Sequence, residues 1–311
     1  MSNTQRTPGD RAVPKPARRA KRANGAHPAA DAPRVTSAGA DGDVWLDGIR
    51  PPGQTESTWE KDPVIELVDV HKAFGSVTVL DGVTVRIPRG EISVLMGPSG
   101  TGKSVALRHI VGLLSPDDGD VYVDGKDVPK LNERDLLALR RGIGMLFQDG
   151  ALFSSMNLYD NVAFPLRQHT SKSEADVREI VMEHLVEVGL AGAEQRFPNE
   201  LSGGMRKRAG FARALVMEPK ILLFDEPDSG LDPVRTTLLC DLIREISQKY
   251  NATSVVVSHD VGAVRRFADN IGILYKGKIR HFGTKDEVEA SDDPFVRQFF
   301  DASATGPLGM D

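Results

Sequence analysis

Between residues 63 and 147 the chain alternates short apolar runs, rich in β-branched residues, with turns that contain glycine. Three runs alternate partly between apolar and polar positions and are divided by glycines, which is typical of antiparallel strands. They are Val64–Val70, Val77–Leu80 and Val83–Ile87. Asp120–Val123, followed by Asp124-Gly125, predicts a further hairpin. Glu91–Met96 and Ile143–Phe147 are more continuously apolar and predict buried core strands.

The second half of the chain changes its period. From about residue 150 to 216 a helical spacing dominates, as in Glu174–Leu185, where Val177, Ile180, Val181, His184 and Leu185 share one face. Strand signals return at Ile221–Phe224 and Ser254–Val257, separated by a helix that starts near Pro233 and ends before Asn251. A strand, a helix and a strand imply a parallel pair. We therefore predict an α/β fold with a mixed, mainly parallel core sheet, an antiparallel β subdomain and a helical insert, whose ligands bind at the carboxyl edge of the core strands.

The chain divides by composition into three parts. Residues 1–62 are rich in Ala, Pro, Arg, Gly and Asp and lack periodicity, so we predict a disordered leader whose removal leaves folding intact. Residues 63–290 form the predicted globular domain, and 291–311 a C-terminal helix and tail. The basic cluster Lys15–Arg22 is either a solvated tail or a contact for anionic lipid or nucleic acid. Trp45 and Trp59 suggest that part of the leader docks somewhere, but the sequence does not indicate where.

Charge and apolar content exclude several classes of protein. The formal net charge of −5 combines +6 in residues 1–34 with −11 in residues 35–311, so the body is no generic polyanion binder and we expect no nucleic-acid partner. The chain contains no run of about 18 apolar residues, so we predict no membrane span. Its first residues also lack the apolar stretch of a secretory signal. The single cysteine, Cys240, lies in a predicted helix and is interpreted as a packing residue.

The most specific motif follows the predicted strand Glu91–Met96. It fits G-x-x-x-x-G-K-[ST], in which backbone N–H groups cradle phosphates, the lysine reaches the β/γ oxygens and the last hydroxyl binds Mg²⁺. Its residues are Gly97, Pro98, Ser99, Gly100, Thr101, Gly102, Lys103 and Ser104. The helix that begins at Val105 directs its N-terminal dipole at the same phosphates. The motif predicts an ATP site.

Polar side chains at the ends of three other core strands complete a predicted hydrolytic site. Asp225 and Glu226 follow the apolar run from Ile221; we expect Asp225 to hold Mg²⁺ through water and Glu226 to orient the attacking water. Gln148, after Phe147, can reach Mg²⁺ or that water. His259, after the run from Ser254, is positioned to contact the γ-phosphate. Each of the last two is, taken alone, more often an ordinary surface residue.

Two further features concern the nucleotide. Phe74 can stack on adenine, with core packing as the rival interpretation. Ser202, Gly203 and Gly204 open the helix Met205–Leu215, which predicts a second anion site with Ser202 as its N-cap. One γ-phosphate sits at two helix N-termini only if they face each other. We therefore predict a head-to-tail homodimer in which each chain covers the nucleotide of the other.

In order and spacing these motifs resemble the ATP-binding cassette superfamily from about residue 64 to 290, which implies a P-loop NTPase fold of that type with ATP and Mg²⁺ as cofactors. The resemblance identifies Gln148 with the Q-loop, Leu201–Gly204 with the signature, Ser229–Asp232 with the D-loop and His259 with the switch histidine. The chain departs from the pattern at Met205, where the signature usually has Gln.

Within the superfamily, Leu146–Asn157, Asn161–Thr170 and the tail Asp293–Phe300 resemble the Mla/Mce lipid-transport ATPases, and the leader resembles actinobacterial members. This implies a peripheral subunit on the cytoplasmic face of the inner membrane. Its implied partners are a permease dimer of the YrbE/MlaE type and, indirectly, extracytoplasmic Mce-like lipid carriers. We expect Leu152, Phe153 and Met156 either to grip the permease or to pack the helical insert. The alternatives are a polar-solute importer and a non-transport cassette protein.

Overall fold

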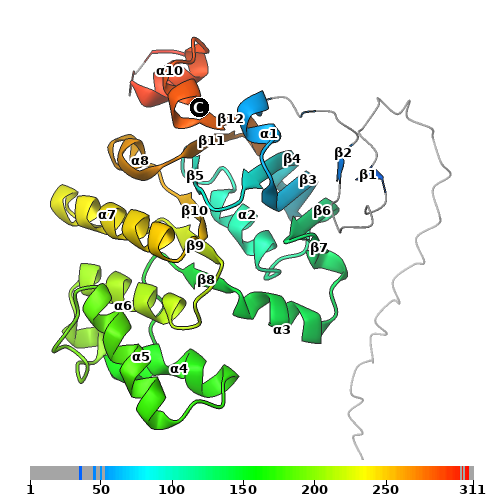
Figure 1. The fold of residues 1–311 in the computed structure, drawn as a ribbon. Helices are drawn as coiled ribbons and strands as arrows, with labels where there is room; N and C mark the ends of the chain where they lie inside the picture. Colours follow the sequence, from blue (N-terminus) through cyan, green and yellow to red (C-terminus); the bar gives the residue numbers. More distant parts are fainter. Residues whose placement is uncertain are drawn as a thin grey trace, which may run out of the picture.

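The protein is described here by a computed structural model that covers residues 35–36, 45–46, 50, 53–301, 303 and 305–307 (Figure 1). Its core is a six-stranded sheet in the order β12-β11-β5-β10-β9-β8. The strands are β5 (Ile92–Met96), β8 (Ile143–Leu146), β9 (Ile221–Asp225), β10 (Thr253–Val257), β11 (Asn270–Tyr275) and β12 (Lys278–Thr284). All neighbours are parallel except β11 and β12. β5, β9 and β10 are buried at every position, as central parallel strands covered on both faces should be.

A second, antiparallel sheet has the order β4-β3-β6-β7. Its strands are β3 (Pro63–Phe74), β4 (Val77–Pro88), β6 (Asp118–Val123) and β7 (Lys126–Asp127). The two strands predicted on either side of Gly82 are one strand, β4. Gly82 has φ +76° and lies where the register with β3 shifts, so it forms a bulge and does not break the strand. With the core sheet, this subdomain confirms the predicted fold class.

Helices cover the core sheet and form a separate lobe (Figure 1). Around the sheets lie α2 (Lys103–Ile110), η1 (Val128–Lys130), α3 (Glu133–Arg141), α7 (Pro233–Lys249), α8 (Val261–Phe267), α9 (Lys285–Glu289) and α10 (Pro294–Phe300). The lobe contains α4 (Leu158–His169), α5 (Glu174–Glu187), η2 (Pro198–Glu200) and α6 (Gly203–Leu215), within the range predicted for the insert. These helices share an apolar cluster of their own that includes Val162, Val181 and Ala209.

Residues 53–62 correct the predicted boundary of the leader. α1 (Glu56–Trp59) and the residues before it pack on the domain. The Thr55 backbone N–H donates to the carbonyl of Phe282 at 2.7 Å, and the Phe282 N–H donates to the carbonyl of Gly53 at 2.6 Å. The physical reason is that β12 is an edge strand with backbone groups left to pair. A short polar segment gives no sign of such a distant partner.

The side chains of this segment add to the docking. The Gln54 amide exchanges two hydrogen bonds of 3.1 Å with the backbone of Arg86. Trp59 packs against Val68 and Tyr122 and lies under the Arg86 guanidinium, 4.6 Å from its ring centroid. Docking by Trp59 therefore agrees with expectation. The rest of the leader, including Lys15–Arg22, lies outside the described residues apart from Arg50 and a two-stranded pair, β1 (Val35–Thr36) with β2 (Trp45–Leu46).

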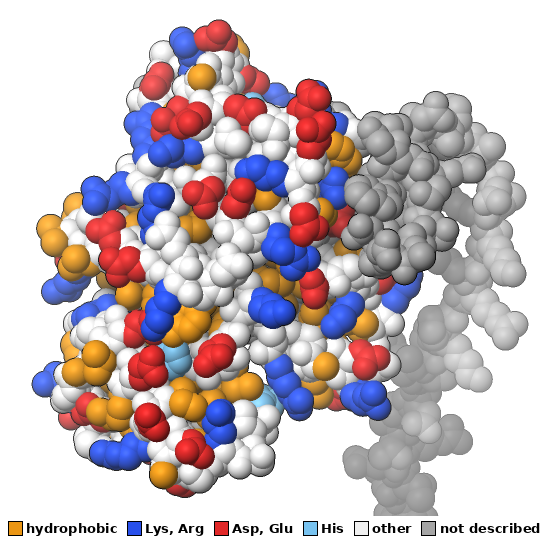
Figure 2. Space-filling view, viewed as in Figure 1, with side chains coloured by type: hydrophobic (Ala, Val, Ile, Leu, Met, Phe, Trp, Pro, Cys, Tyr) orange, Lys and Arg blue, Asp and Glu red, His pale blue; other side chains and the backbone are white. Residues whose placement is uncertain are grey.

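Three predictions made from composition and charge concern membrane spans, surface charge and the single cysteine. Among the described residues, no helix has the length and apolar character to span a bilayer. Figure 2 shows basic and acidic side chains interspersed over the face in view, with hydrophobic side chains gathered at several places on the helical lobe. Cys240 is buried, and burial raises the pKa of its thiol to about 12, so it packs as predicted and is not a reactive thiolate.

Candidate active site

The phosphate loop connects β5 to α2 and wraps around a buried lysine. The Lys103 ammonium donates to the carbonyls of Gly97 and Pro98, both at 2.9 Å. The loop is this tight only because of its glycines. A Cβ on Gly97 would stand 2.1 Å from the carbonyl oxygen of Leu274, and Gly97 also has φ +145°. The sequence Gly97–Ser104 therefore forms the compact turn that the motif predicts.

Backbone donors converge at the start of α2. Within the described residues, no hydrogen bond engages the backbone N–H groups of Gly100, Thr101 or Gly102. The Thr101 hydroxyl instead donates to the carbonyl of Pro98 at 2.9 Å and braces the loop. Free amides at a helix N-terminus make an anion site. Ser99 is exposed at the mouth of this loop, and Val105 lies in the first helical turn.

The second half of the motif meets the end of β9. The Ser104 hydroxyl donates to the Asp225 carboxylate at 2.6 Å. Burial lowers the pKa of the Lys103 ammonium, while the nearby carboxylates of Glu226 and Asp225 act in the opposite direction. The structure therefore brings together four residues that the sequence predicted for one site, from segments more than a hundred positions apart.

Glu226 follows Asp225 in an unusual backbone conformation. Its φ is +49°, in the left-handed region that few residues other than glycine adopt without strain. The Glu226 N–H donates to the carbonyl of Val257 at 3.0 Å, which ties the turn to the neighbouring strand β10. Asp225 pairs with Val257 in the parallel register, so the residues that follow both strands emerge at the same edge. Glu226 is half-buried there.

Gln148 follows β8 and His259 follows β10, the two strands that flank β9 in the core sheet. The Gln148 amide donates to the hydroxyl of Ser229 at 3.1 Å, so it contacts the D-loop and no hydrogen bond joins it to Ser104 or Asp225. His259 is exposed, and among the described residues no hydrogen bond holds its ring. The residue before it, Ser258, is buried and donates to Asp228 at 2.8 Å.

Phe74 lies at the end of β3 with 48% of its surface exposed, which excludes the core-packing interpretation. The Lys72 ammonium lies 5.8 Å from the centroid of its ring. Lys72 is itself held by Asp117 at 2.7 Å. The exposed ring, with a fixed cation beside it, provides a flat apolar face on the antiparallel subdomain.

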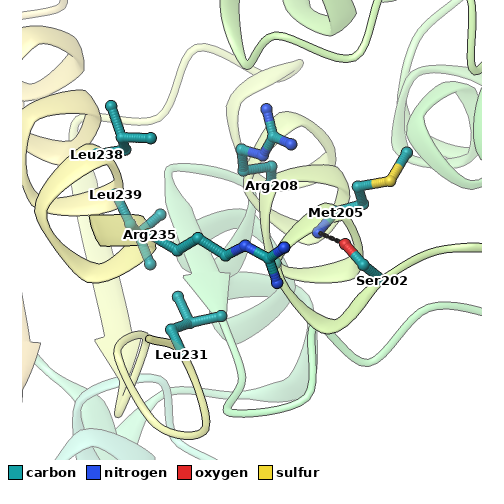
Figure 3. Close-up of a pocket in the computed structure, with 8 residues that line it drawn as sticks. Ser202, Met205, Arg208, Leu231, Arg235, Leu238 and Leu239 are labelled. Atoms are coloured by element: carbon teal, nitrogen blue, oxygen red, sulfur yellow. Dashed lines mark hydrogen bonds between the residues drawn. The ribbon is translucent and has the colours of Figure 1, made fainter. Parts of the chain in front are cut away.

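The signature residues stand apart from the phosphate loop, at the start of α6 in the helical lobe (Figure 1). Ser202 is the predicted N-cap and accepts from the N–H of Met205 at 3.3 Å. Gly203 is exposed and Gly204 half-buried. A cavity of about 350 Å³ lies beside them. Figure 3 shows Arg235 of α7, one of its lining residues, extending toward Ser202 and Met205. No hydrogen bond in the described residues joins this signature to the phosphate loop of the same chain.

Two residues near this edge, Lys207 and Asp228, were not singled out by sequence reasoning. Lys207 in α6 is buried and bonds to the segment after Glu226, and Asp228 is buried against Ser258. The only sequence signal for Asp228 was its place between the carboxylate pair and the D-loop. Lys207 lies between two arginines and gives no signal that it is the buried member of the three.

Comparisons with known proteins agree with this geometry. The family described as ABC transporter matches residues 80–229. The chain is 53% identical over 246 residues to the probable ribonucleotide transport ATP-binding protein mkl of Mycobacterium leprae, which covers 79% of this chain and 71% of that protein. It is 43% identical over 245 residues to the intermembrane phospholipid transport system ATP-binding protein MlaF of Escherichia coli K12, which covers 79% of this chain and 91% of that protein.

Two solved structures are also similar. One is cbiO1 of Clostridium perfringens, part of the ABC transporter complex cbiONQ, with a TM-score of 0.68 and 29% identity over 76% of this chain and 95% of that one. The other is the ATP-binding cassette MJ0796, a dimer in a post-hydrolysis state bound to ADP and Pi, with a TM-score of 0.66 and 32% identity over 71% of this chain and 98% of that one.

Proposed function

Since the chain belongs to the ABC transporter family and is an ATP-hydrolysing subunit, we propose that it energises a lipid transporter through a head-to-tail dimer that encloses two nucleotides. The observation that carries the hydrolytic part is the 2.6 Å contact between the Ser104 hydroxyl and the Asp225 carboxylate, beside Lys103 and Glu226. These groups come from two different strand ends, and their meeting has the geometry that phosphoryl transfer needs.

The residues fit ATP with Mg²⁺. The free amides of Gly100–Gly102 and the glycine turn match a phosphate chain, and Lys103 is placed to exchange its carbonyl partners for phosphate oxygens. A hydroxyl next to a carboxylate offers the oxygen ligands that Mg²⁺ prefers. Ser104 would hold the ion directly, Asp225 through water, and Gln148 after leaving Ser229. Bound there, the ion would neutralise charge on the β and γ oxygens.

Glu226 would orient and polarise the attacking water. Its backbone N–H is fixed by Val257, so its side chain starts from a defined position at the edge of the sheet. His259 is exposed at the same edge and would contact the γ-phosphate, while Lys103 would stabilise the developing charge. Phe74 would stack on adenine, since its ring is exposed at the end of β3.

The dimer follows from the separation of the two anion sites. Ser202, Gly203 and Gly204 present the N-terminus of a second helix, exposed to solvent and away from the phosphate loop of the same chain. A second copy in head-to-tail orientation would bring this terminus to the nucleotide. The dimeric MJ0796 cassette supports such an arrangement.

Cargo and partners come from the relatives. MlaF carries phospholipid in its name, and the chain spans nearly all of that protein. This supports lipid cargo. We further propose, from the resemblance of residues 146–170 and 293–300 to Mla/Mce ATPases, a membrane permease dimer of the YrbE/MlaE type, Mce-like carriers beyond it, and a place on the cytoplasmic face of the membrane. A polar solute is the second candidate because the mycobacterial relative carries ribonucleotide in its name.

The permease would contact the connector after Gln148. Phe153 is 43% exposed, its ring lies 5.0 Å from that of Phe164, and the Arg213 guanidinium lies 5.6 Å from its centroid. The buried Asn161 side chain fixes the backbone of Phe153 through hydrogen bonds of 2.8 and 3.0 Å. An aromatic side chain held on a rigid backbone and still open to solvent suits a partner helix.

Glu226→Gln tests the hydrolytic assignment. This substitution preserves shape but removes the carboxylate, so we expect ATP binding with little turnover and an accumulated ATP-bound dimer, measured by phosphate release and size-exclusion chromatography. Turnover at the wild-type rate would exclude the role given to Glu226.

The cargo class is tested by purifying the untagged native complex from membranes and identifying its proteins and bound molecules by mass spectrometry. Lipid-carrier proteins and co-purified lipid would support the proposal. A solute-binding protein in their place would favour the polar-solute alternative.

A further inference from the structure

A buried cation joins the signature helix to the segment that follows the catalytic carboxylate. Lys207 lies one turn into α6, and only 5% of its surface is exposed. Its ammonium donates to the carbonyl of Pro227 at 2.8 Å, to that of Glu226 at 3.4 Å and, most closely, to that of Ser229. An ammonium has three N–H donors, and here each has a backbone acceptor. All three donors of this ammonium therefore bond to a single turn, residues 226–229.

The same turn receives contacts from two other parts of the site. Gln148 donates to the Ser229 hydroxyl, and Ser258, next to His259, donates to Asp228. Lys207 brings a positive charge to this network, and the carboxylates of Asp228, Asp149 and Glu226 partly offset the burial that lowers the pKa of its ammonium. A buried lysine is costly unless paired, so its presence here calls for an explanation beyond packing.

We propose that Lys207 is a positioning residue for ATP hydrolysis: it clamps the backbone of Glu226–Ser229 onto α6 and so fixes the Glu226 carboxylate relative to the signature of its own chain. The inference rests on the water-orienting role proposed for Glu226. It goes beyond that role because Lys207 reaches Glu226 only at its backbone carbonyl, and among the described residues no hydrogen bond joins it to the phosphate loop or to Asp225.

The clamp matters because the turn is strained. Glu226 has φ +49°, and its N–H is already held by Val257 on one side. Lys207 holds the carbonyl side of the same residue, so the two hydrogen bonds together fix both peptide groups of Glu226. Without the ammonium, the carbonyls of Pro227 and Ser229 lose a charged donor and the turn can relax toward an ordinary conformation. A shift of about 1 Å in a reacting group costs about 100-fold in rate.

The test uses the full chain with Lys207→Met and Lys207→Gln. Methionine preserves the length of the side chain without a donor, whereas glutamine retains two N–H groups. Steady-state ATPase is measured against ATP concentration, and the folded fraction is counted by stoichiometric binding of a fluorescent ATP analogue. For Lys207→Met we expect kcat per folded molecule to fall by about 10- to 100-fold with KM within about threefold of wild type. Lys207→Gln should lie between the two.

Arg140→Met is the matched control. Arg140 also donates to two backbone carbonyls, those of Val111 at 2.9 Å and Gly112 at 2.8 Å, but it holds the far end of α2. Its loss can reduce the folded fraction, while kcat per folded molecule should stay at the wild-type value. If Lys207→Met acted only on stability, it too would reduce the folded fraction and leave kcat per folded molecule unchanged.

The outcomes separate this inference from the one it rests on. Wild-type kcat per folded molecule in Lys207→Met, with Glu226→Gln inactive, would overturn the clamp alone. If Lys207→Met does not fold, Lys207→Gln decides, and an unchanged kcat there would overturn the clamp as well. Turnover retained by Glu226→Gln would overturn the assigned carboxylate and the clamp together. A loss of kcat without a change in KM, partly rescued by glutamine, supports the clamp.

Discussion

Trp59 offers a direct measure of how much the segment before β3 contributes to stability. Its ring is partly buried against Val68 and Tyr122 and lies under the guanidinium of Arg86. Replacing a fully buried tryptophan with alanine costs about 3–5 kcal/mol. Because Trp59 retains some exposure, we expect about 2–3 kcal/mol for Trp59→Ala, the cation–π contact included. For a domain of this size that lowers the melting temperature by about 4–12 °C.

Removing residues 1–52 is the control. That deletion preserves Gln54 with its two hydrogen bonds to Arg86, the backbone pairing of Thr55 with Phe282, and Trp59 itself. We expect its melting temperature to match that of the full chain. It also leaves Trp59 as the sole tryptophan, so intrinsic fluorescence reports the docking of this segment alone.

The assay is thermal unfolding followed by circular dichroism and by tryptophan fluorescence of the shortened chain. The two transitions should coincide if the segment belongs to the folded body. A fluorescence transition well below the main one would mean that the segment undocks first. Equal melting of Trp59→Ala and wild type would refute the stabilising role, and a large loss on removing residues 1–52 would assign it to the leader instead.

Four further substitutions test the nucleotide site, the signature and the connector after Gln148. Gly97→Ala should abolish ATP binding, because its Cβ would meet the Leu274 carbonyl oxygen at 2.1 Å; titration with a fluorescent nucleotide measures this, and retained affinity would contradict the tight loop. Ser202→Arg should abolish ATPase activity and Met205→Gln change it only modestly, since the hydroxyl and backbone make the anion site; the reverse order of phosphate-release rates would refute the head-to-tail arrangement. Phe153→Asp should prevent capture by the permease in a pull-down while circular dichroism and ATP binding stay normal, because its ring is exposed; an unfolded protein would favour packing of the lobe, and an intact transport-competent complex would remove this connector as the coupling surface.

The positions of residues that directly follow core strands were predictable from the sequence. Parallel strands place their carboxyl ends at one edge, so the apolar runs before Gly97 and Asp225 were enough to predict that Ser104 and Asp225 meet. The prediction required only strand order and motif spacing. The contacts of individual side chains did not follow in the same way, since Gln148 bonds to Ser229 and no hydrogen bond joins it to Asp225.

Contacts between distant segments were not predictable in the same way. The segment of Gln54 and Trp59 is polar and short, and its partners lie on β4 and β12, so composition alone assigned it to the leader. Gly82 was interpreted as a break between strands because a single sequence does not reveal the neighbour that holds a bulge in place. Both errors concern pairing across the sheet, which local pattern does not encode.

α6 contains three consecutive basic residues, and helix geometry accounts for the burial of one of them. Successive residues on a helix point about 100° apart, so Arg206, Lys207 and Arg208 face three different surroundings. Arg206 donates to the carbonyl of Leu201 at 2.8 Å, at the start of the signature, and Arg208 to those of Val188 and Gly189 at 3.1 and 3.0 Å, after α5.

Lys207 takes the remaining direction, toward the core, where the turn after Glu226 offers three carbonyls. Two turns further along α6, Arg213 donates to the carbonyls of Gly150 and Ala151 at 3.1 and 3.0 Å, in the connector that leads to Phe153. One helix thus carries hydrogen bonds to the signature, the catalytic turn and the connector. A movement of α6 that retained these bonds would displace Phe153 and Pro227 together, which is the linkage that the permease contact proposed for Phe153 would require.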